Sequence, residues 1–229
     1  MKRSIFILLC VLFCLGAAAL FLYCTPFGVG LTNDSAAYIG GARSLLAGQG
    51  YVRIGGDGLP RAITHFPPFY SIVLAAVSRL TGLDPLDAAK WVNLVCAVLN
   101  QALFMTALLV LTGSRPAAIL GGITFLCAGP VLQGEIYGLS EALYLTLFLL
   151  NFTLSVKASR QGMKWSWLLI GLLSAALVLT RYAGFAAVGA LVVFILCALP
   201  NAKARLRSLL LFLAGLAVPL GVWLVKGSS

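Results

Sequence analysis

The chain has 229 residues, of which 61% are hydrophobic and only 10% are charged, and its mean hydropathy is +1.04. Soluble domains are roughly half apolar and a quarter charged, so this composition excludes an ordinary soluble domain. The formal net charge is +10. The basic residues lie mainly in the gaps between apolar runs and not on one face with interleaved aromatic side chains, so we expect no nucleic acid partner.

Apolar runs of about 18 residues or more, the length that crosses ~30 Å of hydrocarbon, recur along the chain. They predict an all-α, polytopic membrane protein that forms a single transmembrane module over residues 1–229. The first run could be a secretory signal, but it is about 20 residues long and lacks a clean small-x-small cleavage pattern, so we interpret it as a retained span. About seven transmembrane helices are predicted, near 4–24, 90–112, 116–133, 139–156, 165–181, 182–199 and 208–225.

The basic residues between the runs predict an orientation. Lys2 and Arg3 precede the first span, and cytoplasmic loops of membrane proteins carry an excess of Lys and Arg. We therefore expect an integral protein of the cell (inner) membrane, with its N-terminus in the cytoplasm and with membrane lipids as partners. The alternate loops that then face the cytoplasm contain Arg115, Lys157, Arg160, Lys164, Lys203, Arg205 and Arg207.

The apolar stretch 165–199 must contain a reversal. As one helix it would be about 52 Å long at 1.5 Å per residue, almost twice the thickness of the membrane. Both of its ends are basic and so lie on the cytoplasmic side. We expect the chain to fold back near Arg181, which places this side chain at or just beneath the outer surface.

The long polar segment 25–88 is predicted to be the first external loop. Because a loop of this length without its own structure is unusual, we expect it to contain helices that lie on the membrane. One is predicted at 34–47, with Asn33 or Asp34 as its N-cap and Gly48 at its end. The other is predicted at 67–81, where the apolar run is too short to cross the membrane.

Asp34 is the first candidate for chemistry. On a helix that begins here, Tyr38 lies one turn further along the same face, whereas Arg43 points the opposite way. An exposed carboxylate at the membrane surface could accept a proton from an acceptor hydroxyl. The alternative is an aspartate that only caps a helix.

Glu141, Arg181 and His65 complete the candidate residues. An acid in the first turn of a helix is favoured electrostatically, but an ionisable group near membrane depth is costly and marks a functional candidate; Glu135 is the weaker acid of the two. Arg181 cannot lose its proton, so a phosphate partner or simple snorkelling to the headgroups must accommodate it. His65 is the only histidine, which excludes a zinc site built on histidines and leaves a structural hydrogen bond or a substrate contact.

The order of several short motifs resembles that of the polyprenyl-phosphate-sugar-dependent glycosyltransferases of the GT-C fold, which include protein O-mannosyltransferases and aminoarabinose transferases. Each motif is weak alone, and the resemblance runs from about residue 1 to 225. The motifs, in chain order, are Asn33-Asp34, Ala36-Ala37-Tyr38, the stretch Ala42-Arg43-Ser44-Leu45-Leu46-Ala47-Gly48-Gln49-Gly50-Tyr51, Pro67-Pro68-Phe69-Tyr70, Ser140-Glu141 and Leu179-Thr180-Arg181.

The resemblance implies an inverting enzyme that moves a sugar from a polyprenyl-phosphate donor to a lipid, glycan or protein acceptor at the outer face of the membrane. By this resemblance, Asp34 matches the position of the family's catalytic base. The candidate substrate-binding residues are Glu141, Arg181, Tyr38 and His65. Arg181 would stabilise the charge on the leaving phosphate, with or without a divalent cation. Members of the superfamily are generally longer, so the chain resembles their membrane module alone.

A different class of function remains open. A transporter or flippase, or an assembly subunit without chemistry, would also be apolar and polytopic. The charges of a transporter, however, would line a path through the midplane. Here Asp34, Glu141 and Arg181 are all predicted on one side of the membrane, which favours an external surface site.

Overall fold

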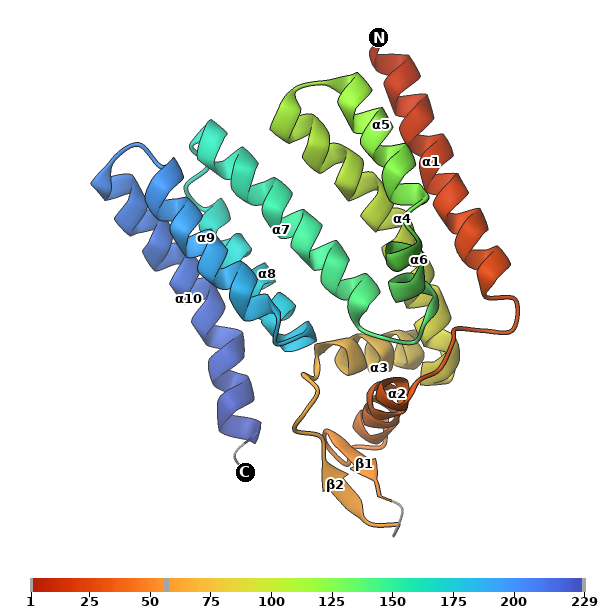
Figure 1. Ribbon diagram of the computed structural model, residues 1–229. Coiled ribbons are helices and arrows are strands. Elements are labelled where there is room, and N and C mark those ends of the chain that lie inside the picture. The colour runs from red at the N-terminus through yellow and green to blue at the C-terminus, as the bar shows by residue number, and fades with distance from the viewer. Residues whose placement is uncertain (1, 56–57, 228–229) are drawn as a thin grey trace. The chain divides into compact units, whose positions relative to one another are not determined.

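The protein is described by a computed structural model that covers residues 2–55 and 58–227. Residues 56–57 of the predicted external loop lie outside the described residues. The chain forms two compact units, Met1–Thr146 and Leu147–Ser229, which we describe in turn. Figure 1 shows the elements of both units along the chain.

The first unit consists of helices and one small hairpin. Its helices pack mainly as α1 on α4 and α5, and as α2 and α3 on α4. The elements are α1 (Arg3–Cys24), α2 (Asn33–Leu46), β1 (Val52–Ile54), β2 (Pro60–Ala62), α3 (Phe69–Thr81), α4 (Pro85–Thr112), α5 (Arg115–Leu126), α6 (Gly129–Ile136) and the first turns of α7 (Glu141–Gln161).

The second unit contains the rest of α7 together with α8 (Ser166–Thr180), α9 (Gly184–Ala198) and α10 (Ala202–Gly227). Its core is built around Trp167 and Ile170 of α8, Ile195 of α9 and Phe212 of α10. Helices α8 and α10 approach closely at two glycines, because a Cβ on Gly171 would overlap the carbonyl oxygen of Phe212, and one on Gly215 would overlap that of Leu168.

Four helices in the described part of the chain are long and apolar enough to cross a membrane: Arg3–Cys24, Pro85–Thr112, Glu141–Gln161 and Ala202–Val225. Their outer faces carry large exposed apolar side chains, such as Leu15 at 61% exposure on α1 and Leu210 at 58% on α10. Exposed apolar surface on this scale suits lipid and not water. The chain is therefore an all-α, membrane-embedded protein, as its composition predicts.

The other three predicted spans have a different form. The segment predicted at 116–133 consists of α5 and α6, which are bent by 59° at a short break. Helices α8 and α9 have 15 residues each, which is shorter than a straight span requires. The reversal between them falls at Arg181, as the sequence predicts.

The two helices predicted in segment 25–88 are present as α2 and α3, but two details differ. The N-cap of α2 is Thr32, whose side chain accepts a hydrogen bond from the backbone N–H of Ser35 in a reciprocal capping box. The prediction that Asn33 or Asp34 caps this helix is therefore wrong. Between the two helices lies the antiparallel hairpin β1–β2, which the sequence analysis did not predict.

Candidate functional site

The segment that leads into α2 is tied to the segment that leads into α7. The backbone N–H of Gly30 donates to the carbonyl oxygen of Ile136 over 2.9 Å, and the N–H of Gly138 donates to the carbonyl of Gly30 over 2.8 Å. A Cβ at Gly30 would lie 2.7 Å from the ring of Tyr137, so a larger residue here would force this ring to shift. The two segments that precede α2, with Asp34, and α7, with Glu141, are thus held together within the first unit.

Asp34 lies in the first turn of α2 and is exposed. The capping box of Thr32 and Ser35 satisfies the helix N-terminus without it. A carboxylate in the first turn is still favoured by the helix dipole. The side chain is therefore accessible for chemistry and is not required as a cap.

Tyr38, one turn along α2, is buried and links three segments. Its side chain is 3% exposed, and its hydroxyl forms a hydrogen bond of 3.0 Å with Ser140 Oγ. Its carbonyl oxygen accepts from Ser71 Oγ of α3 over 2.8 Å. Its ring contacts those of Phe66 and Tyr70, with centroids 5.2 and 5.4 Å apart. Tyr38 thus fixes α2 against α3 and the start of α7.

Glu141 is the first residue of α7 and follows the serine that contacts Tyr38. Its side chain is half-buried, and its Oε2 atom is fully buried. Burial raises the pKa of Tyr70 of α3, and neighbouring groups that include Glu141 and Tyr38 raise it further. Tyr38, Tyr70 and Glu141 therefore belong to one cluster in the first unit.

A buried amide network beside this cluster was missed by the sequence analysis. Asn93 of α4 accepts from the Tyr70 hydroxyl over 2.9 Å and donates to the carbonyl oxygens of Glu135 and Tyr137. Asn100, two turns further along α4, donates to Glu135 Oε1 over 3.0 Å. The sequence signal was the seven-residue spacing of two asparagines, which places both on one face of an apolar helix.

Glu135, predicted as the weaker candidate, is the more deeply buried acid. It is 7% exposed and receives its hydrogen bond from Asn100. Thr146 of α7 in turn donates to Asn100 Oδ1 over 2.7 Å. This network holds α6 and the start of α7 against α4, and so it helps to fix the position of Glu141 in the first turn of α7.

His65 lies in the segment between β2 and α3 and is exposed. It borders a small cavity of about 140 Å³ that Arg53 and Arg61 of the hairpin also line. The residue after it, Phe66, contacts the ring of Tyr38. His65 is therefore connected to the cluster through its neighbour and faces a basic cavity.

Arg181 belongs to the other compact unit, where it ends α8. Its backbone N–H donates to the carbonyl of Leu177 over 3.0 Å, and its carbonyl accepts from the N–H of Gly184 over 2.9 Å. Its side chain is half-buried. The structure thus brings Tyr38, Glu141 and the start of α2 together, and it places Arg181 at the reversal between α8 and α9.

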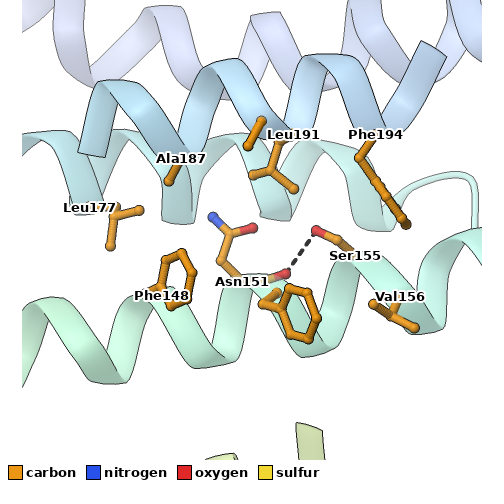
Figure 2. Close-up of a pocket in the computed structure, with 10 residues that line it drawn as sticks. Phe148, Asn151, Ser155, Val156, Leu177, Ala187, Leu191 and Phe194 are labelled. Carbon is orange, nitrogen blue, oxygen red and sulfur yellow. Dashed lines mark hydrogen bonds between the residues drawn. The ribbon is translucent and has the colours of Figure 1, made fainter. Parts of the chain in front are cut away.

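The second unit also contains an apolar cavity of about 310 Å³ between α7, α8 and α9. Figure 2 shows Phe148, Leu191 and Phe194 around it. Asn151 Nδ2 donates to Ser174 Oγ over 2.8 Å, and the backbone carbonyl of Asn151 accepts from Ser155 Oγ over 2.8 Å, whereas the buried Oδ1 of Asn151 has no hydrogen-bond partner among the described residues. The cavity therefore suits an apolar chain.

Within residues 2–55 and 58–227, no group of three or more His, Cys, Asp or Glu side chains is arranged to hold a metal ion. Comparison with protein-family models, curated proteins and solved structures finds no match to this chain.

Proposed function

We propose that this chain is a membrane glycosyltransferase module that transfers a sugar from a polyprenyl-phosphate donor to an acceptor hydroxyl at the outer face of the membrane. The observation that carries the proposal is the attachment of α2 to the start of α7. The Gly30–Tyr137 backbone contacts and the Tyr38–Ser140 hydrogen bond hold the helix of Asp34 beside the segment of Glu141. Acids from two distant segments are thus kept in one region.

The proposed reaction is a single inverting displacement. The Asp34 carboxylate takes the proton from the acceptor hydroxyl, and the oxygen attacks the anomeric carbon on the face opposite the phosphate. The bond between that carbon and the phosphate oxygen breaks, and its electron pair leaves with the polyprenyl phosphate. Glu141 accepts hydrogen bonds from hydroxyls of the sugar or the acceptor and so orients them. Tyr38 and His65 bound the region on the side of α2 and the hairpin.

Arg181 is assigned to the leaving phosphate. An arginine guanidinium matches phosphate in geometry, because its planar fork donates two parallel hydrogen bonds to two phosphate oxygens. Helices α8 and α9 have 15 residues each, so each extends about 22 Å, less than the ~30 Å of hydrocarbon. With the basic ends of this pair at the cytoplasmic surface, the reversal at Arg181 lies beneath the outer surface, where a charge needs an anion.

The proposed membrane arrangement has seven crossings, with α5 and α6 together forming one bent crossing. If the N-terminus is in the cytoplasm, then α2, the hairpin and α3 lie on the outer side of the membrane. The reversal at Arg181 lies on the same side.

The test is sugar transfer from a series of polyprenyl-phosphate sugars in membranes with matched protein levels. We expect Asp34→Asn to lower turnover by about 10²–10⁴-fold, the usual contribution of a general base. The matched control is Asp87→Asn, because Asp87 is also an exposed acid in the first turn of a helix, α4.

We expect the control to retain the turnover of the unmodified chain. Because Thr32 caps α2, Asp34→Asn costs α2 only the small dipole contribution of one surface charge, roughly 0.3–1 kcal/mol. A loss of folded protein therefore does not explain a loss of turnover. Normal turnover of Asp34→Asn would contradict the assignment of Asp34 as the base and therefore the proposed mechanism.

A further inference from the structure

The hairpin β1–β2 places two arginines opposite each other. Its antiparallel register pairs Arg53 with Arg61, flanked by the pairs Val52–Ala62 and Ile54–Pro60. Directly opposed residues on an antiparallel pair have Cβ atoms only ~5 Å apart, and like charges there are destabilising. Both side chains are exposed.

Two cavities meet at Arg53. The larger one, about 500 Å³, lies between α2 and β1. The smaller one, about 140 Å³, is bordered by Arg61 and His65 as well as Arg53. None of the described residues that line either cavity is Asp or Glu. A volume of about 500 Å³ is within the usual range for small-molecule sites.

The floor of the larger cavity is a face of α2 with small side chains, including Ala36 and Gly40. A Cβ built on Gly40 would meet nothing within 4 Å, so space remains above this face. Polar side chains at the edge, such as Asn33 and Gln49, offer hydrogen-bond donors. The cavity thus combines open space, neutral donors and a cationic side.

Arg43 also borders the larger cavity, but its charge is already balanced. Its Nε and Nη2 atoms donate to the two carboxylate oxygens of Asp84 over 3.0 and 2.7 Å. This bidentate contact lowers the pKa of Asp84 below its usual value and raises that of Arg43. The positive charge offered to a ligand therefore comes above all from Arg53, which lines both cavities.

We propose that α2 and the hairpin form a binding site for a phosphate group, with Arg53 at its centre and Arg61 opposite. Arginine suits phosphate because its planar fork donates two parallel hydrogen bonds to two phosphate oxygens. The phosphate belongs either to the headgroup of an anionic phospholipid or to a soluble phosphorylated molecule. Phosphate binding at Arg53 does not require sugar transfer.

The test uses the full chain in detergent micelles. Binding of inorganic pyrophosphate is measured by titration calorimetry, and binding of phosphatidylglycerol, with phosphatidylcholine for comparison, is measured by native mass spectrometry. We expect Arg53→Gln to weaken binding about tenfold or more, since a charge-assisted contact is lost from both cavities.

A second variant separates binding from folding. Arg61→Glu places a carboxylate opposite Arg53, and opposite charges across two strands stabilise a hairpin. We expect this variant to lose binding while its thermal unfolding temperature stays at or above that of the unmodified chain. The matched control is Arg79→Gln, which removes one exposed arginine from the last turn of α3 and should leave binding unchanged.

Loss of binding in both hairpin variants and retention in Arg79→Gln supports the site. Pyrophosphate binding alone identifies a soluble phosphorylated ligand, and phosphatidylglycerol binding alone identifies a lipid headgroup. The proposal is overturned if the unmodified chain binds neither probe, if both hairpin variants bind as tightly as it does, or if Arg79→Gln weakens binding as much as Arg53→Gln.

Discussion

At the scale of single residues, the first unit separates an exposed acid from the buried groups that position it. Asp34 is exposed, whereas four residues later Tyr38 is 3% exposed and its hydroxyl contacts Ser140. A buried hydroxyl that lacks its partner costs about 1–3 kcal/mol. Tyr38 is therefore a positioning residue, and its loss should affect Asp34 and Glu141 together.

We expect Tyr38→Phe to lower the free energy of unfolding by about 1 kcal/mol, because the ring contacts remain but the hydrogen bond to Ser140 is lost. In a chain of this size that change lowers the thermal midpoint by roughly 2–4 °C. The matched control is Tyr23→Phe, which removes a hydroxyl from a side chain that is 83% exposed. Equal midpoints for Tyr38→Phe and the unmodified chain, measured in detergent, would contradict the positioning role.

The sequence predicted Asp34 as an exposed acid at the start of a helix but misassigned the cap. Thr32, Asn33 and Asp34 are all residue types that cap helices, so composition could not choose among them. The choice depends on Ser35, whose Oγ accepts a hydrogen bond from the backbone N–H of Thr32. The asparagines of α4 were missed for a related reason, since their partners lie far away in the sequence.

At the scale of elements, local signals decided which segments could be predicted. Helix α4 ends at Thr112, as predicted, with Gly113 in the left-handed conformation as its C-cap, but it begins at Pro85 behind the N-cap Asp84 and not at the predicted residue 90. The hairpin has strands of only three residues and lacks the alternation of apolar and polar residues that indicates a strand. The bend between α5 and α6 was missed, although Gly129-Pro130 at the start of α6 is a sequence signal for a break.

The contact between α8 and α10 gives a prediction at this scale. A Cβ on Gly171 would overlap the backbone of Phe212, so Gly171→Ala must push the two helices apart. We expect a loss of about 1–3 kcal/mol, the usual cost of overpacking. It is measured as a lower midpoint of thermal unfolding in detergent.

Gly189→Ala in α9 is the matched control. A Cβ there meets nothing within 4 Å, and alanine is favoured over glycine inside a helix by roughly 0.5–1 kcal/mol. We expect its midpoint to be unchanged or higher. If Gly171→Ala is as stable as Gly189→Ala, helices α8 and α10 do not depend on this close approach.

At the scale of the whole molecule, the distribution of charge distinguishes the two units. The second unit contains no Asp or Glu in its sequence, and all its charged residues are Lys or Arg. Most of them are at the end of α7 and the starts of α8 and α10. One of them, Arg207, lies over the ring of Trp165 at 5.6 Å, a contact typical of residues at a membrane interface.

This charge pattern predicts which segments face the cytoplasm. Single cysteines are introduced on a cysteine-free background at Gln49, Gln161 and Asn201, all of which are exposed. In intact cells, a membrane-impermeant maleimide should label position 49, near the proposed phosphate site. Positions 161 and 201, beside the basic helix ends, should react only after the membrane is permeabilised, because basic loops remain on the cytoplasmic side. Labelling of position 161 from outside would reverse the second unit and place Arg181 on the cytoplasmic side, where it could not serve a reaction at the outer face.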